Sequence, residues 1–338
     1  MRLHLQIRFF LLFVITGVAK PLYAQHYQFS QFYASQTYLN PAFAGSSGCT
    51  RVMMTYRDQW PTVPGTFVTS QISVDHYVKE LKSGIGILFF NDMAGSGALK
   101  STQFSLLYAY EFKLSKKIMV RTGLSMGGIQ RSIDYSTLLF GDQIARGGAA
   151  TSVENISTPK VTYFDVGSGV LMYTANSWLG FSGSHLNTPN QSLKAGVSTL
   201  PADYKVHGGY RIVMEDDDAS KKTEATKYMS FAFNYQHQYK FDQLDLGFYY
   251  TKNPFVLGLW YRGIPLFKAY KPGYSNNGAI IFLAGVVLGK CKIGYSYDLT
   301  ISKLTNVNSG GAHEVTLSYQ FCAKPHKRKL ILISCPKF

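Results

Sequence analysis

Hydrophobic and polar residues alternate along most of this chain with a period of two. In residues 103–112, for example, every even-numbered position from Phe104 to Phe112 is apolar, whereas Gln103, Ser105 and Glu111 are polar. Successive residues of a β-strand point to opposite faces, so each such segment predicts a strand with one apolar and one polar face. Fourteen strands are predicted in this way, at residues 50–57, 66–77, 83–91, 99–112, 118–129, 161–174, 177–184, 204–213, 226–237, 243–251, 253–262, 277–288, 290–300 and 312–321.

The connections between these segments alternate in length. Counted from the first, the odd-numbered connections are mostly long and the even-numbered ones mostly short, with exceptions at 238–242 and 214–225. Outer-membrane barrels have long extracellular loops and short periplasmic turns, and each strand crosses the membrane with about 9–11 residues. A soluble β-sandwich has no reason to alternate its loop lengths. The sequence therefore predicts an all-β fold, a transmembrane outer-membrane antiparallel β-barrel of about fourteen strands with both termini in the periplasm.

The composition agrees with a membrane barrel. The 338 residues include 24 Tyr, 23 Phe and 31 Gly, and only 16% of them are charged. The mean hydropathy of −0.04 is far too low for a bundle of transmembrane helices. A disordered chain would show the opposite balance, with few hydrophobic residues and many charges. Apolar and polar strand faces average to a neutral hydropathy, as a barrel requires.

The first residues have the form of a secretory signal. Arg2 and Arg8 precede the apolar run 9–15, and residues 22–24 offer a cleavage site. A short buried N-terminal helix is the alternative interpretation. We divide the chain into a signal peptide (1–24), an N-terminal periplasmic or plug segment (25–48), the barrel (49–322) and a basic periplasmic C-terminal tail (323–338).

The positive charge of the chain predicts anionic partners. Removal of the signal lowers the formal net charge from +15 to +12, and the densest basic cluster lies at 324–329. Nucleic acid is not expected as a partner, because this exported chain has no recognition motif for it. Outer-membrane lipid or lipopolysaccharide is the expected anionic partner, and a solvated tail is the alternative role for the cluster.

Residues 25–48 lack the alternation of a strand but contain six aromatic residues. We predict that this segment folds under or into the periplasmic mouth of the barrel and closes it, with an extension along the rim as the alternative. Asn40-Pro41 is a turn signal, because proline fixes its own φ and disfavours helix in the residue before it. Gly45 allows a sharp turn before the first strand. We expect Asn40, Pro41 and Gly45 to set the register in which that strand enters the barrel.

Parity along the strands places several polar and aromatic residues on the lumen side. The odd positions of 255–261 are apolar and expected to face lipid, which turns Trp260 and Arg262 toward the lumen. Arg57 and Glu314 have the inner parity of the first and last strands. We expect charge pairs across the lumen to brace it rather than to select ions. The inward carboxylates that can pair with these arginines include Glu111, Asp245 and Asp298.

The predicted extracellular loops carry the candidate partner-binding residues, because loops on rigid scaffolds often carry function. In the first loop, Pro61 stiffens the chain beside Trp60, a large side chain of the kind that anchors interfaces. The alternative is that Trp60 folds back onto the rim or into the lumen. Asp142 and Gln143 are the candidates in the long loop 130–160.

The four cysteines all lie near the predicted periplasmic end, in a compartment where disulfides persist. Cys49 and Cys322 share the inward parity of the first and last strands, which must meet when the barrel closes. We therefore predict a disulfide between Cys49 and Cys322 at the seam, and a second between Cys291 and Cys335 that holds the tail. Free thiols are the alternative for all four.

Several sequence blocks resemble one protein family. In chain order they are Phe29-Ser30-Gln31-Phe32-Tyr33, Tyr38-Leu39-Asn40-Pro41-Ala42-Phe43-Ala44-Gly45, Tyr56-Arg57-Asp58-Gln59-Trp60-Pro61, Phe140-Gly141-Asp142-Gln143-Ile144, His185-Leu186-Asn187-Thr188-Pro189, Phe241-Asp242-Gln243-Leu244-Asp245-Leu246-Gly247, Gly258-Leu259-Trp260-Tyr261-Arg262-Gly263 and Cys335-Pro336-Lys337-Phe338. With these blocks the chain resembles the PorP/SprF family of type IX secretion system membrane proteins of Bacteroidetes. The resemblance covers nearly the whole mature chain.

The resemblance implies an outer-membrane barrel that works with the type IX export machinery. Some members of the family act with periplasmic ring proteins and lipoproteins of the secretion apparatus. Others are partners of large exported adhesins that carry a C-terminal sorting domain, including those of gliding motility. No catalytic residue is carried over from the family.

No catalytic, cofactor or metal site is predicted. The sequence contains no Gly-x-Ser-x-Gly elbow, no phosphate-binding loop and no His-Glu-x-x-His motif. The acidic run 215–218 lacks the glycine and the distal glutamate of a calcium-binding loop. We therefore expect a non-enzymatic protein, and a passive diffusion porin is the alternative function.

Overall fold

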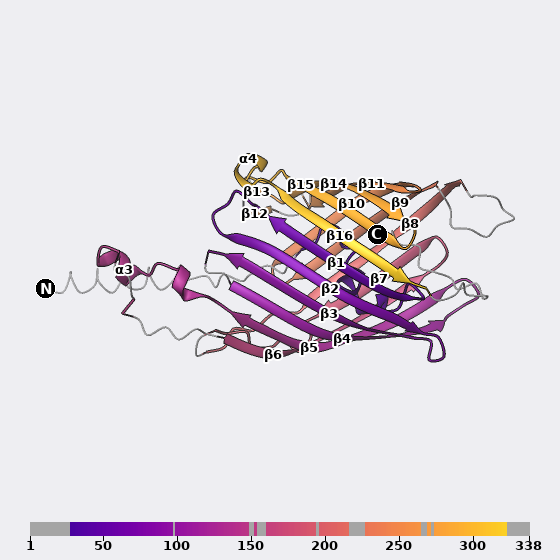
Figure 1. Cartoon of the computed structure of the whole chain (residues 1–338), viewed down its shortest axis with the longest axis horizontal. Helices are drawn as coiled ribbons and strands as arrows, with labels where there is room; N and C mark the ends of the chain where they lie inside the picture. The colour runs from indigo at the N-terminus through magenta and orange to yellow at the C-terminus, as the bar shows by residue number, and fades with distance from the viewer. Residues whose placement is uncertain are drawn as a thin grey trace.

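The structure is a computed structural model, and a closed β-barrel forms almost all of it (Figure 1). The structure describes residues 28–96, 99–148, 152–153, 160–193, 196–215, 227–264, 269–271 and 274–322. The fourteen strands of the barrel are β1 (Thr50–Gln59), β2 (Thr66–Val78), β3 (Ser83–Gly95), β4 (Leu99–Lys113), β5 (Met119–Ser132), β6 (Lys160–Tyr173), β7 (Ser177–Ser184), β8 (Asp203–Glu215), β9 (Lys227–Gln238), β10 (Phe241–Lys252), β11 (Phe255–Gly263), β14 (Asn277–Leu288), β15 (Cys291–Thr300) and β16 (Ala312–Phe321).

Each barrel strand pairs antiparallel with its neighbours in sequence order, and β1 closes the ring by pairing with β16. Two further short strands, β12 (Ala269–Lys271) and β13 (Tyr274–Ser275), form a separate small sheet. All fourteen predicted segments are barrel strands, with ends that differ from the predicted ones by at most four residues. The predicted antiparallel barrel is therefore confirmed.

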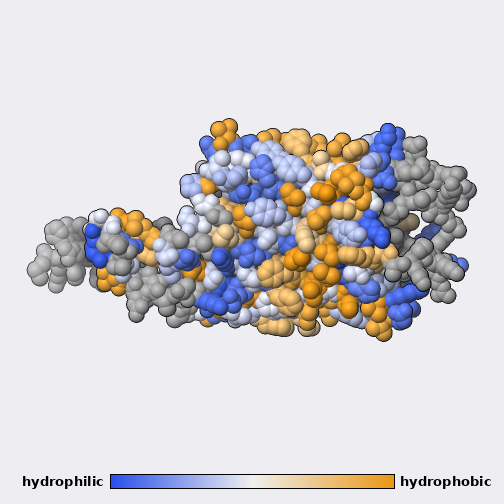
Figure 2. All heavy atoms as spheres, viewed as in Figure 1, coloured by the Kyte–Doolittle hydropathy of each residue, from blue (hydrophilic) through white to orange (hydrophobic). Residues whose placement is uncertain are grey.

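The alternation in the sequence becomes the two faces of the barrel wall. Along β4, the side chains of Phe104, Leu106 and Tyr108 are exposed on the outside, whereas Ser105 and Ala109 are buried toward the lumen. Figure 2 shows hydrophobic residues gathered across the middle of the visible wall and hydrophilic ones toward its rims. An outward apolar band of this kind is the surface that contacts the hydrocarbon of a membrane.

The two ends of the barrel differ in the length of most of the connections between strands. We call the end at which β1 finishes the long-loop end, and the end at which β1 begins the short-turn end. The helices η2 (Tyr135–Thr137), α3 (Gly141–Ala145) and α4 (Asn306–Ser309) all lie in long-loop connections (Figure 1). Two further helices, α2 (Gln36–Leu39) and η1 (Pro41–Phe43), precede β1. None of the helices in the described ranges has the length and apolar character needed to span a membrane.

The seam between β1 and β16 is closed covalently at the short-turn end. A disulfide joins Cys49 to Cys322, with their Cα atoms 5.1 Å apart, directly below the paired residues Thr50 and Phe321. Cys291 forms no disulfide with another described residue. Its predicted partner, Cys335, lies outside the described residues, as does the rest of the tail from residue 323.

Candidate functional site

The lumen of the barrel contains the described residues that precede β1. We call residues 28–48 the plug. Gln28 lies at the long-loop end beside Gln59, whereas Gly45 reaches the short-turn end, where its N–H donates to Asp75 of β2 at 2.7 Å. Between them the plug contacts strands on every side of the lumen, among them β1, β6, β8 and β16. The plug therefore runs along the lumen from one end to the other rather than along the rim.

Aromatic side chains of the plug form an apolar core with the inner wall. Phe32 packs edge-on against Trp260, with ring centroids 4.9 Å apart, and Tyr33 packs against Trp178 at 5.7 Å. The Tyr33 hydroxyl donates to backbone carbonyls of β8 and β9, and Tyr33 is fully buried. Trp260 thus lies in the lumen as its parity predicts, and it packs against the plug.

Nearer the long-loop end, a network of buried charges crosses the lumen. Arg57 donates to Asp298 at 2.9 Å and to Glu314 at 3.1 Å. Arg262 donates to Asp245 at 2.8 Å and also to Asp298 at 3.1 Å. Arg57 and Glu314 are cross-strand partners at the seam between β1 and β16. Asp245, Asp298 and Glu314 are therefore brought together with the two arginines in one network, whereas Glu111 pairs with Arg121 instead.

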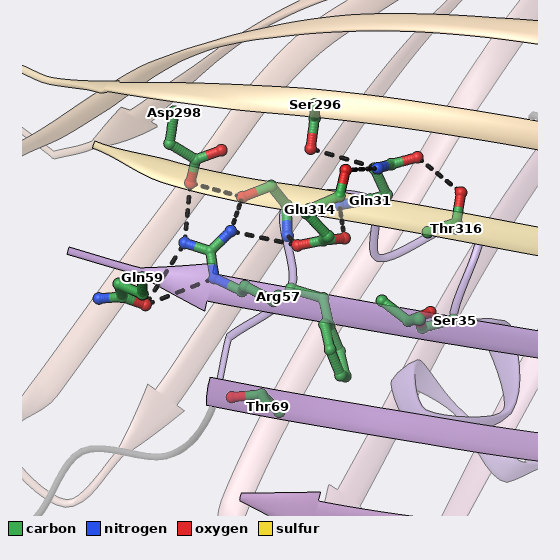
Figure 3. Close-up of polar contacts among 12 residues, drawn as sticks. Gln31, Ser35, Arg57, Gln59, Thr69, Ser296, Asp298, Glu314 and Thr316 are labelled. Carbon is green, nitrogen blue, oxygen red and sulfur yellow. Dashed lines mark hydrogen bonds and ion pairs between the residues drawn. The ribbon is translucent and has the colours of Figure 1, made fainter. Parts of the chain in front are cut away.

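This network holds the backbone of the plug (Figure 3). The two carboxylate oxygens of Glu314 accept the N–H groups of Ser30 and Gln31, at 2.7 and 2.8 Å. The Ser30 hydroxyl donates to Asp298 at 2.6 Å, and the Gln31 side chain bonds to Ser296 and Thr316. Glu314 is 0% exposed. A charged acceptor makes stronger hydrogen bonds than a neutral one, so Glu314 is a strong attachment point for the plug.

Two more buried arginines hold the plug at the short-turn end. Arg121 pairs with Glu111 at 2.6 Å and donates to the carbonyls of Ala42 and Ala44. Arg51 pairs with Asp75 at 3.0 Å and donates to the Gln36 side chain and to the Phe43 carbonyl. The wall thus binds the plug mainly through its backbone groups, at both ends of the lumen.

The Asn40-Pro41 turn lies in the middle of the plug. The Asn40 side chain accepts the N–H of Ala42 at 2.9 Å and caps η1, which begins at Pro41. Its amide also donates to the carbonyls of Val170 and Phe181 on the wall, and Asn40 is 0% exposed. Asn40 therefore both shapes the plug and attaches it to β6 and β7.

Three inward glycines of the wall make room for the plug, and sequence reasoning missed them. A Cβ added at Gly84 would lie 1.8 Å from the Ala44 carbonyl oxygen, one at Gly123 2.2 Å from the Ala42 nitrogen, and one at Gly169 2.1 Å from Asn40 Oδ1. The signal that could have found them is glycine at positions of inward parity. Glycine is needed because the plug backbone approaches Gly84 and Gly123 directly, and the Asn40 side chain approaches Gly169.

We expect the substitution Gly123→Val to displace the plug. The valine side chain cannot fit against Ala42, so we expect a loss of about 1–3 kcal/mol in stability and faster proteolysis of the plug. Gly128→Val on the same strand is the matched control, because a Cβ there meets no atom within 4 Å. Urea unfolding and limited proteolysis measure both effects. Equal stability and equal protection of the plug in the two variants would contradict this account.

A vestibule lies above the plug at the long-loop end. It consists of two cavities of about 300 and 280 Å³ that share Gln28, Gln59, Trp60 and Gln238 as lining residues. Trp60 is half-buried and packs edge-on against Phe67 at 5.6 Å, so it faces the mouth of the lumen. Of the candidate pair in this loop, Pro61 is the exposed one.

The other candidate pair lies on α3, far along a long loop. Gln143 is buried and its side chain accepts the Phe140 N–H at 2.8 Å. Asp142 accepts from the Val153 N–H, the Ser152 hydroxyl and Arg146. These donors, the Val153 N–H first, lower the pKa of Asp142 to about 2. Both residues therefore shape the loop, and Asp142 stays ionised until the pH falls toward that value.

We expect Asp142→Ala to loosen this loop without affecting the barrel. The change removes two hydrogen bonds that join α3 to residues 152–153 and a third to Arg146 at the end of α3, so a protease should cut the loop several-fold faster. Ile144→Ala, an exposed position on the same helix, is the control. Because the folded-state pKa is lowered, the contribution of Asp142 is present at neutral pH and disappears only near pH 2. Equal cleavage rates at neutral pH would refute the assigned role.

The described residues contain no cluster of three or more His, Cys, Asp or Glu side chains that could hold a metal ion. The buried ion pairs of Arg51, Arg57, Arg121 and Arg262 hold the plug. The arrangement can bind a chain segment and close a channel.

Comparisons with known proteins place the chain in a family. Residues 22–319 match the family described as type IX secretion system membrane protein PorP/SprF. The comparison with curated proteins finds no match. Among solved structures, the barrel is similar to the toluene transporter TodX of P. putida, with 10% identity over 84% of this chain and 93% of that one and a TM-score of 0.45. It is also similar to the outer membrane protein Omp33 of Acinetobacter baumannii, with 6% identity, 81% and 98% coverage and a TM-score of 0.39.

The match spans the plug and nearly the whole barrel, and it agrees with the apolar outer wall of a protein embedded in the outer membrane. The chain belongs to the PorP/SprF family of type IX secretion system membrane proteins.

Proposed function

We propose that this protein is a closed, non-enzymatic outer-membrane component of type IX secretion that supports the export or surface attachment of large adhesin-type cargo. The single observation that carries the proposal is the filled lumen. The plug is bound by Glu314 and Arg262 at one end and by Arg51 and Arg121 at the other. In such a barrel the plug occupies the space that would be a water-filled channel in a passive diffusion porin. We therefore expect the protein to act by binding partners at its two ends rather than by passing solutes through its lumen.

The proposal gives each end of the barrel a partner. With the long loops outside the cell, the vestibule and α3 face exported cargo, such as an adhesin with a C-terminal sorting domain. The short-turn end then faces periplasmic ring proteins and lipoproteins. Two turns at that end, 79–82 and 113–117, carry five lysines and only one glutamate, a charge that favours an acidic partner or anionic lipid.

Purification of the native barrel from its own cells tests this function. We expect it to co-purify with an exported adhesin or with periplasmic ring proteins, and we expect deletion of the chain to reduce adhesin at the cell surface. The deletion strain is then complemented with the variant Trp60→Ala, which tests the vestibule, and we expect it to restore less adhesin at the cell surface than the wild type does. The control is Phe255→Ala, on the outer wall, which should restore the wild-type amount. If the barrel purifies alone, and its deletion slows the uptake of small solutes but leaves surface proteins unchanged, the protein is a diffusion porin.

A further inference from the structure

The direction of the plug in the lumen has a consequence for how the barrel is assembled. Ser30 and Gln31 bind Glu314 near the long-loop end, and Gly45 binds Asp75 near the short-turn end. The chain therefore descends the lumen from Gln28 to Cys49 and then turns back into β1. The N-terminal end of the plug points to the long loops, opposite to the end where the seam disulfide lies.

Little chain separates Gln28 from the cleavage site predicted after Ala24. Residues 25–27 lie outside the described residues, but three extended residues span at most about 11 Å. Gln28 itself lines both cavities of the vestibule. A mature chain that begins at residue 25 must therefore begin in or beside the vestibule.

The vestibule is suited to receive that short segment. Gln238 is 5% exposed and lines both cavities, and its Oε1 has no hydrogen-bond partner among the described residues. An N–H or α-amino group that precedes Gln28 would supply the missing donor. Each cavity, at about 300 Å³, is at the lower limit of ligand pockets and matches a few residues rather than a domain.

The precursor cannot reach this arrangement with its signal attached. Residues 1–24 contain an apolar run and three basic residues, and a signal peptide acts at the inner membrane. To return from the vestibule to the periplasm, the chain would have to pass beside a plug whose Tyr33, Ala42 and Phe43 are 0% exposed. It would have to displace the apolar core around Trp260 or the arginine contacts at the short-turn end.

We propose that the mature N-terminus lies in the long-loop vestibule, open to the cell exterior, and that removal of the signal peptide must precede insertion of the plug. The proposal uses the membrane orientation given under Proposed function and assigns the N-terminus to the side opposite to the sequence-based expectation. Proteolytic processing thereby becomes a condition for closing the barrel. It also adds the first mature residues to the face that exported partners meet.

An epitope tag inserted between Gln25 and His26 tests the position of the N-terminus. The same tag between Gly148 and Ala149 reports the orientation of the long loops, and a tag after Phe338 reports the periplasmic side. On intact cells, we expect antibody to label the first two tags and to label the third only after the outer membrane is permeabilised. If the loop tag is labelled on intact cells and the N-terminal tag is not, the proposal is overturned.

Loss of labelling at both the N-terminal and loop tags would also overturn it, because the vestibule would then face the periplasm. Neither result bears on co-purification with adhesin, so failure of this proposal and failure of the proposed function are distinguishable.

A cleavage-blocked precursor tests the order of events. Ala24→Phe replaces the small residue that a signal peptidase requires, and Gln25→Ala is the control that keeps it. We expect the uncleaved chain to leave residues 28–48 open to protease, whereas the control protects them. An uncleaved chain that protects its plug as well as the control does would overturn the proposed order.

Discussion

Deletion of residues 29–46 is expected to convert this barrel from a closed protein into a conducting channel. The deletion removes the side chains that fill the lumen and keeps the turn that leads to Cys49. Barrels of about 16 strands leave an aqueous channel, and a fourteen-stranded barrel is only slightly narrower. The exposed lumen would carry Arg57, Arg262 and their carboxylate partners, which water can solvate. In planar bilayers we expect stable open channels from the deletion variant and none from the intact protein.

A loop deletion of equal length, residues 140–157, is the matched control, because it lies in a loop at the long-loop end. It should leave the barrel closed. The Cys49–Cys322 disulfide reports whether each variant has folded, since it forms only when the ends of β1 and β16 meet. The plug would have no role in closure if the intact barrel conducts as strongly as a folded deletion variant.

The barrel could be predicted from the sequence because its signal is local and repeated. Every strand carries the period-two pattern on its own, so fourteen segments could be located independently. Parity then assigned Arg57, Trp260 and Arg262 to the lumen, and in the structure they lie there. This works because side-chain direction in a strand follows from position alone.

The contacts of the plug could not be predicted in the same way. Glu314 lies 284 residues from Ser30 along the chain, and no periodic signal connects them. In the sequence, Gly84 and Gly123 cannot be told apart from the other glycines of the barrel strands. Only the path of the plug shows why no side chain fits at these two positions. Trp60 likewise lines the vestibule together with Gln28 of the plug, and it packs against Phe67 of the next strand. Such contacts are set by packing between distant segments.

Loss of Glu314 is expected to lower the stability of the closed barrel. In the variant Glu314→Ala, Arg57 loses one of its two carboxylate partners, and the N–H groups of Ser30 and Gln31 lose their acceptor inside the barrel. Each of the two buried N–H groups left without its acceptor costs about 1–3 kcal/mol, whereas the charge of Arg57 stays compensated by Asp298. We expect a loss of that size in urea unfolding, together with a plug that is released at its long-loop end.

The variant Glu314→Gln distinguishes the contribution of the Glu314 charge from that of its hydrogen bonds to the plug. The amide oxygen can still accept one of the two plug N–H groups, so this variant should lie between the wild type and Glu314→Ala in stability and in protection of residues 28–31. Glu80→Ala removes an exposed carboxylate from a short turn and should change neither. Conductance supplies a second readout, because Glu314→Ala should open intermittently while the arginines at the short-turn end still hold Ala42 and Phe43. Glu314→Ala could instead prove as stable as Glu80→Ala and show no more conductance than it does. In that case the plug is held by its aromatic core alone, and the Glu314 carboxylate only neutralises Arg57.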